Sequence, residues 1–180
     1  MNSGGGGPVV HQRRENLVSG TRNPKEPNRA SGVSLRPARP DDYDFAIDLY
    51  LDSTRRLLTA LGRWNRGRVI ARFKRAFKAE QVRVICAGGA DIGWMQISEP
   101  DDRLHLHQLH IVARFRNRGI GTRLIRALLD RARRLGRPVG LNVIRGNRAL
   151  SLYRQLGFRV IGGDAERLYM RWNAEGPERP

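Results

Sequence analysis

The sequence is poor in cysteine and has no long apolar run. Its 180 residues include one cysteine, Cys86, so no disulfide can form within the chain. Cys86 lies in the apolar segment 82–87, which favours a buried and unreactive thiol. No apolar run approaches the roughly 20 residues of a membrane-spanning helix. Residues 1–14 contain four consecutive glycines and no apolar segment typical of a secretory signal. We therefore expect a cytoplasmic protein with no membrane partner.

Lysine is also scarce, although the chain is strongly basic. Only three of the 34 basic residues are lysines, and 17 acidic residues leave a net charge of +17. This arginine bias is typical of GC-rich coding sequence, which we prefer to a nucleic-acid surface as the explanation. Basic and aromatic residues are not interleaved as in single-strand binders. We expect no specific nucleic-acid partner, but the charge favours small anionic ligands.

Composition divides the chain into one domain and two tails. Residues 1–32 are rich in Gly, Pro, Asn, Ser and Arg and show no periodicity, which predicts a disordered N-terminal tail. Residues 33–173 carry periodic apolar patterns and form the predicted domain, which is long enough to bury a core. Residues 174–180 are predicted to be a short disordered C-terminal tail.

Periodicity within the domain predicts both strands and helices. Period-two or short apolar segments predict strands at 33–36, 82–87, 92–98, 104–112, 139–143, 158–161 and 168–172. Helical periodicity predicts one helix opening at 40–42, then others at 66–77, 120–135 and 147–156. The basic side of the 66–77 helix, which includes Arg72, is most simply a solvated face. This element order predicts a mixed α/β fold with helices on both faces of the sheet.

The loop Arg116–Thr122 lies between a strand and an amphipathic helix. Helix N-termini carry unpaired N–H groups and partial positive charge, so they bind anions. Gly119 and Gly121 let the backbone approach a phosphate, and Arg116 and Arg118 add charge. The loop lacks the third glycine of a dinucleotide-binding fingerprint, and the chain has no Gly-Lys-Ser/Thr of a Walker A loop. The pattern therefore predicts a site for a different phosphate-bearing ligand.

Two segments together resemble a known family. The strand 104–112 with the loop 116–122 resembles the acetyl-CoA motif of the GCN5-related N-acetyltransferase (GNAT) superfamily. The segment Asn147–Phe158 is similar to the family's helix with Asn, Ala, Tyr and Gly-Phe. The resemblance covers about residues 33–172. It implies a mixed, mostly antiparallel sheet of six or seven strands that splays between strands 4 and 5. It also implies acetyl-CoA as cosubstrate, no metal, and direct acetyl transfer to a primary amine.

The resemblance assigns roles to particular residues. The backbone at Leu109 and Ile111 is expected to pair with the pantetheine arm. Pyrophosphate is expected on the main chain of Arg116, Asn117, Arg118, Gly119, Ile120, Gly121 and Thr122, with Asn147 and Ala149 completing the cofactor site. Tyr153 matches the general acid of the family, and a phenol with its usual pKa near 10 is protonated at neutral pH. The alternative for Tyr153 is a core aromatic residue.

His105 and His107 are the candidate general bases. Two residues apart on a strand, they are expected on one face, and imidazole titrates near neutrality. The pair resembles the histidines of the arylalkylamine N-acetyltransferase branch, which relay a proton through water. The alternative is that both are half-buried, hydrogen-bonded strand residues. His110 is expected on the opposite face in a structural role, and Glu99 is a rival base.

The acceptor amine is left open by the sequence. A small-molecule amine, a peptide or protein N-terminus, and a non-catalytic CoA-binding module are the alternatives. The cluster Glu99, Asp101 and Asp102 can recognise a cationic acceptor, although a solvated turn is the simpler interpretation. Whether the chain is a monomer or a homodimer is also left open.

Overall fold

The computed structural model describes residues 32–174 of the chain. The tails predicted for 1–32 and 174–180 lie outside the described residues, apart from Gly32 and Ala174 at the two boundaries. Within the described part, no helix has both the length and the apolar character needed to cross a membrane.

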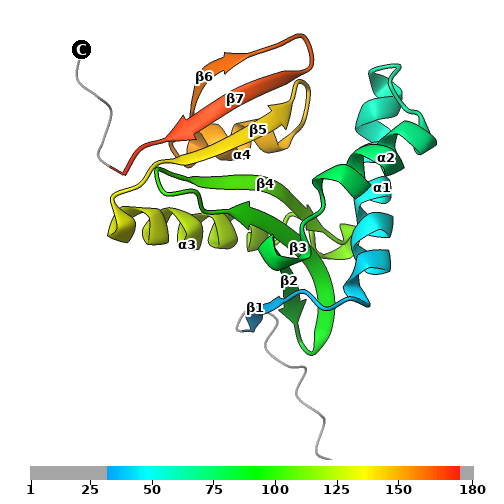
Figure 1. Ribbon diagram of the computed structural model, residues 1–180, viewed down its shortest axis with the longest axis horizontal. Helices are drawn as coiled ribbons and strands as arrows, with labels where there is room; N and C mark the ends of the chain where they lie inside the picture. Colours follow the sequence, from blue (N-terminus) through cyan, green and yellow to red (C-terminus); the bar gives the residue numbers. More distant parts are fainter. Residues whose placement is uncertain (1–31, 175–180) are drawn as a thin grey trace, which may run out of the picture.

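The domain is built on one sheet with helices on both faces (Figure 1). The strands lie in the order β1-β2-β3-β4-β5-β7-β6, and all neighbours are antiparallel except β4 and β5. The strands are β1 (Val33–Pro37), β2 (Val82–Ala87), β3 (Ala90–Ser98), β4 (Leu104–Ile111), β5 (Val139–Ile144), β6 (Arg159–Gly163) and β7 (Arg167–Trp172). The helices are α1 (Asp42–Ala60), α2 (Arg66–Ala76), α3 (Ile120–Leu135) and α4 (Ala149–Gln155).

The predicted elements are all present, and the fold class is confirmed. The bounds of α3 agree with the prediction, since Gly119 and Gly136 flank it with φ of 72° and 61°. β3 begins two residues earlier than expected because the turn at Gly88–Gly89 is tight, with both residues at positive φ. Three-residue 3-10 turns follow α2 and β4, at Ala79–Gln81 and Ala113–Phe115.

The sheet opens between β4 and β5. These strands pair at only three positions, from Leu104↔Val139 to Leu106↔Leu141. Beyond Leu106, β4 stays paired with β3 on one side while its other edge diverges from β5. The expected splay between strands 4 and 5 is therefore present, and it leaves main-chain groups of β4 facing a gap.

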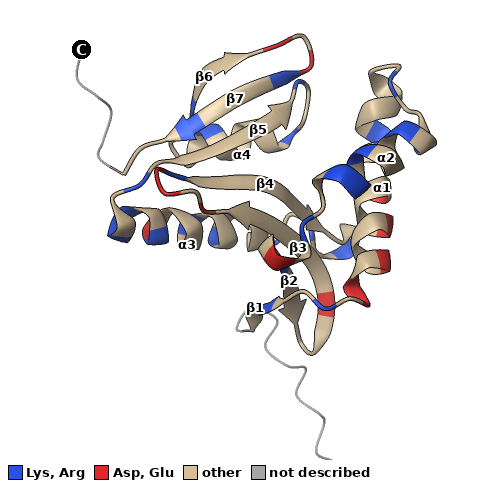
Figure 2. Cartoon of the chain, viewed as in Figure 1, with Lys and Arg blue, Asp and Glu red and all other residues tan. Residues whose placement is uncertain are grey.

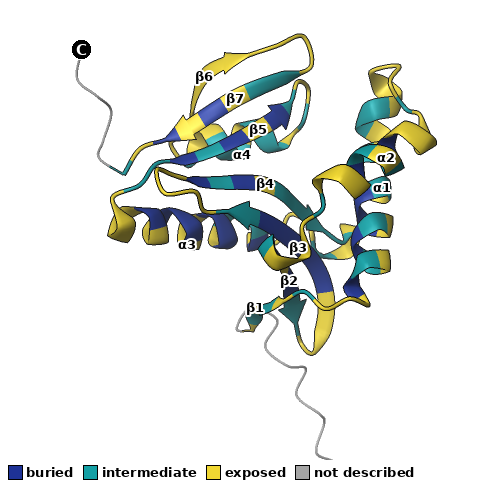
Figure 3. Cartoon of the chain, viewed as in Figure 1, coloured by how far each residue is buried: buried dark blue, intermediate teal, exposed yellow. Residues whose placement is uncertain are grey.

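Two separate apolar clusters lie on the two faces of the sheet. Figure 3 shows buried residues along β3, β4 and β5 and on α1 and α3. The larger cluster packs α3 against the sheet through aliphatic residues such as Leu106, Ile125 and Leu141. The smaller cluster packs α1 and α2 through aromatic residues, including Tyr50, Phe73 and Trp94. The Trp94 indole also donates a hydrogen bond of 3.1 Å to the Ala46 carbonyl, which ties β3 to α1. The second face therefore combines aromatic packing with polar contacts.

Candidate active site

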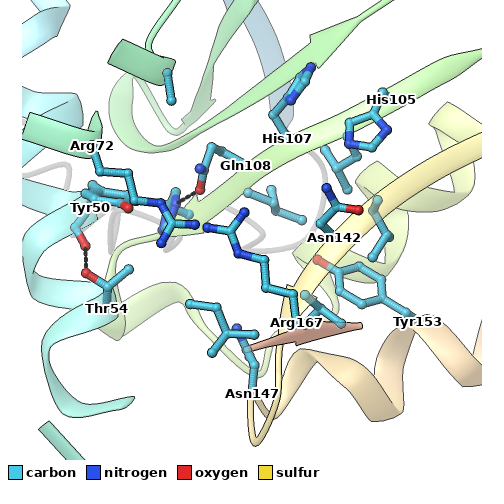
Figure 4. A pocket seen from close by; sticks show the side chains of 17 residues that line it. Tyr50, Thr54, Arg72, His105, His107, Gln108, Asn142, Asn147, Tyr153 and Arg167 are labelled. Atoms are coloured by element: carbon cyan, nitrogen blue, oxygen red, sulfur yellow. Dashed lines mark hydrogen bonds between the residues drawn. The ribbon is translucent and has the colours of Figure 1, made fainter. Parts of the chain in front are cut away.

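A pocket of about 230 Å³ lies where β4 and β5 separate (Figure 4). Its walls come from α1, α2, β4, β5, α4 with the turn before it, and β7. His105, His107 and Tyr153, which the sequence nominates as catalytic, all line it. Segments from both halves of the chain are thus brought together around the three residues.

His105 and His107 lie side by side on β4. Their ring centroids are 4.6 Å apart, and a 2.7 Å hydrogen bond links His107 Nε2 to Ser98 Oγ. Burial, then the neighbouring His107 and Arg103, lowers the pKa of His105 to about 4. Burial also lowers the pKa of His107. Both imidazoles are therefore neutral at physiological pH and able to accept a proton.

The expectation for His110 is wrong in one respect, because β4 contains a bulge. Gln108 pairs with Gln96 and Leu106 with Ile97, so His107 has no partner of its own and the alternation shifts by one residue. His110 consequently shares the α1–α2 face with the other two histidines, where it stacks on Trp94.

The structural role assigned to His110 does fit its environment. Hydrogen bonds of 2.6 Å and 2.8 Å join its ring nitrogens to Ser53 and to Gln108. Burial and the positive charge of Arg116 lower its pKa to about 3. The ring is thus neutral and held on both sides.

Tyr153 projects from α4 into the pocket. Its ring packs edge-on against Phe158 with centroids 5.7 Å apart. Burial raises its pKa to about 12, so the phenol keeps its proton across the physiological range. Within residues 32–174 the hydroxyl makes no hydrogen bond, and in Figure 4 it points toward the side of the pocket lined by Asn142. A donor without a partner is available to a ligand.

The loop before α3 has the geometry of an anion site. Asn117 and Gly119 adopt left-handed conformations, with φ of 59° and 72°. Gly119 is the N-cap of a 16-residue helix, and no side chain caps it. Apart from contacts within helices and strands, the N–H groups of Asn117, Arg118 and Gly119 make no backbone hydrogen bond in the described part of the chain. Such N–H groups, together with the helix dipole, suit a pyrophosphate.

The two loop arginines have structural contacts that the sequence does not reveal. Arg116 Nε donates a 2.6 Å hydrogen bond to the Ile111 carbonyl, and its guanidinium lies 3.6 Å from the Asp52 carboxylate. The Arg118 guanidinium lies over the Phe115 ring at 5.5 Å. Arg116 therefore connects the loop to β4 and α1, in addition to supplying charge.

The other expected cofactor contacts lie on β4, at the start of α3 and at the start of α4. Leu109 and Ile111 follow the bulge, and their side chains face Gly121 across the α3 side of the sheet. Ile120 is buried at the start of α3, and Thr122 is partly buried. Asn147 lines the pocket, but its Oδ1 accepts a 2.9 Å hydrogen bond from the N–H of Ala149. Asn147 thus caps α4 and helps to hold Tyr153 in place.

The rival base and the acidic turn lie outside the pocket. The Glu99 carboxylate forms an ion pair with Arg131 of α3 at 2.6 Å. Neither Glu99 nor Asp101 nor Asp102 lines the pocket.

The residues that line the pocket and that sequence reasoning missed include Tyr50, Arg72, Asn142 and Arg167. Arg72 belongs to the helix side expected to be solvated, and no sequence signal distinguishes it from its basic neighbours.

Comparison with known proteins decides the family. The model of the acetyltransferase (GNAT) family matches residues 44–158, well over half of the chain. The chain belongs to this family. GNAT proteins are acetyl-CoA-dependent N-acetyltransferases, and the match includes β4, the loop, α3 and the Tyr153 helix, which carry the site described above.

Individual relatives agree with the family assignment. The chain is 40% identical over 81 residues to the N-alpha-acetyltransferase RimI of Mycobacterium tuberculosis, which is 42% of this chain and 50% of that protein. The chain thus matches about half the length of this curated relative.

Solved structures share the fold. A PaiA N-acetyltransferase from Thermoplasma acidophilum in complex with coenzyme A has a TM-score of 0.66 at 16% identity, covering 79% of this chain and 99% of that one. An acetyltransferase from Thermus thermophilus has a TM-score of 0.60 at 15% identity, covering 78% and 96%. At these identities the likeness concerns the fold alone.

Proposed function

We propose that the protein transfers the acetyl group of acetyl-CoA directly to a primary amine in the pocket between β4 and β5. The observation that carries the proposal is that the opened edge of β4 and a protonated tyrosine line one pocket, while β4 leads into the N-terminus of α3, which has the geometry of an anion site. Acetyl-CoA supplies an activated acyl group as a thioester. The loop from Arg116 to Thr122 would hold its pyrophosphate, and the free edge of β4 at Leu109 and Ile111 would hold its pantetheine arm.

His105 and His107 act as the base in this proposal. The amine nitrogen bonds to the thioester carbonyl carbon, and the resulting tetrahedral species carries an ammonium that must lose one proton. A proton on such an intermediate is far more acidic than on a free amine, so an imidazole with a lowered pKa is able to accept it. The pair of rings, 4.6 Å apart, provides the acceptor directly or through one water.

Tyr153 acts as the acid. When the carbon–sulfur bond breaks, the electron pair leaves on sulfur, and the phenol donates a hydrogen bond and then the proton that forms the thiol. Solvent returns that proton to the phenolate. The pKa of about 12 keeps Tyr153 protonated before each turnover, and the absence of a hydrogen-bond partner within residues 32–174 leaves its O–H available.

A peptide N-terminus is the second candidate for the acceptor. It is favoured by the 40% identity, over part of the chain, to a protein named as an N-alpha-acetyltransferase. A second, shallower pocket of about 200 Å³ also shares His105, Leu141 and Asn142 with the first. Because the two pockets share these lining residues they are neighbours, and a peptide acceptor would be able to contact both.

The test is an acetyl-CoA turnover screen that measures free thiol release. Acceptors should include polyamines, aminoglycosides, arylalkylamines, amino acids and short peptides with free N-termini. We expect release with at least one class, and mass spectrometry should show an acceptor heavier by one acetyl group. Tight coenzyme A binding with no release for any acceptor would instead identify a non-catalytic CoA-binding module.

A further inference from the structure

Two arginines face one another across the acceptor side of the pocket. Arg72 projects from α2 and Arg167 from β7, and both line the pocket (Figure 4). In the close-up view their guanidinium groups point toward each other, between Tyr50 and Thr54 of α1 on one side and Asn142 and Asn147 on the other. The second helix and the last strand of the domain thus bring two positive charges to one pocket.

Neither guanidinium has a partner within residues 32–174. None of the ion pairs and side-chain hydrogen bonds in that part of the chain involves either guanidinium, and the hydrogen bonds of Arg167 are made by its main chain. Two other arginines differ in this respect: Arg63 pairs with Glu166, and the Arg145 side chain donates to the Asp164 carbonyl. Like charges held together without a counter-charge repel each other, so an anion between them is stabilised.

The walls of the pocket contain no carboxylate at all among the described residues. Acidic residues lie instead on α1, β3 and α3, on the 3-10 turn Ala79–Gln81, and on the turns that join β3 to β4 and β6 to β7 (Figure 2). The other polar side chains that line the pocket are the hydroxyls of Tyr50, Thr54 and Tyr153, the amides of Gln108, Asn142 and Asn147, and neutral histidines. The Gln108 oxygen is hydrogen-bonded to His110. The pocket therefore offers donors and positive charge, which disfavours a polyamine or an aminoglycoside.

We propose that Arg72 and Arg167 together bind an oxyanion of the acceptor, so that the substrate class is a primary amine that carries a carboxylate. This inference rests on the proposed acetyl transfer and names its acceptor. Planar guanidinium groups bind carboxylates through paired hydrogen bonds, and a pocket of about 230 Å³ suits an amino acid or the first residues of an acidic peptide. The amine then lies on the side of the pocket lined by His105, His107 and Tyr153.

The cofactor phosphates are assigned to a different place. The loop before α3 contacts α1 through Asp52, whereas the pocket is lined by Tyr50 and Thr54 of that helix. On a helix, residues two apart point in widely different directions, so Asp52 lies away from the pocket side of α1. Arg72 and Arg167 are thus left for the acceptor.

The experiment compares matched acceptors that differ in one group. β-Alanine carries a carboxylate, β-alaninamide a neutral amide, 1,3-diaminopropane a second cation and 2-aminoethylphosphonate a phosphonate. A peptide arm compares Ala-Glu-Ala amide with Ala-Gln-Ala amide. We expect kcat/KM for the acid to exceed that for its amide by at least about tenfold in one arm, because charge-assisted hydrogen bonds are lost in the amide. The comparison that shows this preference tells whether the acceptor is a small amino acid or a peptide. A higher kcat/KM for 2-aminoethylphosphonate than for β-alanine would refute the proposal that the bound group is a carboxylate.

Arginine variants locate the effect. Arg72→Gln and Arg167→Gln should each reduce the acid-to-amide ratio toward one by raising the acceptor KM, with the KM for acetyl-CoA unchanged. Arg75→Gln is the matched control, since Arg75 is exposed on the same helix and lines neither pocket. A higher KM for acetyl-CoA with an unaltered acid-to-amide ratio would assign both arginines to the cofactor and overturn the proposal. Preference of the wild type for the amide or the diamine would overturn it as well.

A binding measurement separates this inference from the proposed function. β-Alanine and Ala-Glu-Ala amide are each titrated by calorimetry into the coenzyme A-saturated protein. For the acid that binds, Arg72→Gln should raise the dissociation constant about tenfold and Arg75→Gln should leave it unchanged. If no acceptor releases thiol, the proposed function fails, while arginine-dependent binding of the acids still supports the oxyanion site. If thiol is released but neither arginine affects acid binding, the transferase stands and the oxyanion site is refuted.

Discussion

The two faces of β4 have different surroundings. On the α3 face, Leu104 and Leu106 are almost fully buried in the larger apolar cluster. On the α1–α2 face, His110 packs against Tyr50 and Trp94, and His105, His107 and His110 all line a pocket. One face therefore stabilises the domain, and the other holds neutral imidazoles whose pKa values are lowered by burial.

This difference shows how one small sheet can form both a hydrophobic core and a candidate active site. Period-two alternation alone would send every second residue of β4 to each face. The bulge at His107 shifts the alternation by one residue, so that Gln108 and His110 lie on the pocket face and Leu109 and Ile111 lie on the α3 face. Bulges are often found beside active sites because they redirect a side chain in this way.

The largest expected effect comes from breaking the α3 face. Ile125 has no exposed surface, so Ile125→Ala should lower the free energy of unfolding by about 2–5 kcal/mol through lost burial and a cavity. Chemical denaturation measures the loss. Ile161→Ala is the control, because Ile161 is 58% exposed and its truncation should have little effect on unfolding. Equal losses for the two variants would contradict the assignment of the core to this face.

Removal of the proposed acid should have the next largest effect, now on the pocket face. Tyr153→Phe deletes one hydroxyl without a hydrogen-bond partner in the described chain, so we expect kcat to fall about a hundredfold with acetyl-CoA affinity retained. Steady-state kinetics and calorimetry with coenzyme A measure the two quantities. Tyr169→Phe is the matched control, since that exposed hydroxyl donates to Asp164 on the β6–β7 turn. Unchanged turnover in Tyr153→Phe would rule out the acid.

The histidine pair should show a smaller effect with a pH signature. His105→Ala or His107→Ala is expected to lower kcat/KM about tenfold. In the wild type the base functions only when neutral, so its activity is present above its folded pKa and lost as pH falls through it. For His105 this loss is centred near pH 4, well below the usual 6.5. Wild-type pH–rate curves in both variants would show that neither histidine is the base.

The smallest effect tests the position of His105 without removing it. Gly140 pairs with His105 where β4 and β5 still touch, and an added Cβ there would lie 2.9 Å from His105 Nδ1. Gly140→Ala should therefore displace the imidazole and reduce kcat a few-fold, with acetyl-CoA KM and thermal stability nearly unchanged. The same change at exposed Gly89 is a poor control because its φ is positive, so Gly67→Ala serves instead. A fully active Gly140→Ala would place His105 outside the chemistry.

Much of the fold follows from local patterns in the sequence. Gly119, Gly136 and the apolar stripe between them define α3 to the residue, because glycine can adopt the left-handed conformation at both ends of the helix. Strand existence was predicted throughout, whereas the ends of β3 and β6 differ by one or two residues from the prediction. Those ends depend on the turns and on cross-strand pairing, which a single strand's composition does not contain.

Parts of the site follow from sequence and parts do not. The loop at Arg116–Thr122, the histidine pair and Tyr153 stand in recognisable motifs, and the structure brings the last two into one pocket. Their catalytic and cofactor-binding roles remain predictions that the variants above test. Arg72 and Arg167 could not be found in this way, since the chain is rich in arginine and nothing local marks these two as inward-facing.

The sequence by itself determined the family, the cosubstrate class and the order of the elements, because short motifs and periodicity are local properties of the chain. Only the tertiary structure decided that His110 shares a face with His105 and His107, since a bulge depends on the register between β3 and β4. Only the tertiary structure, too, set Arg72 against Arg167 in a pocket without a carboxylate among the described residues. Arg72 and Arg167 are 95 positions apart in the sequence and line one pocket because α2 and β7 lie on either side of the opening between β4 and β5. No local sequence pattern encodes this arrangement.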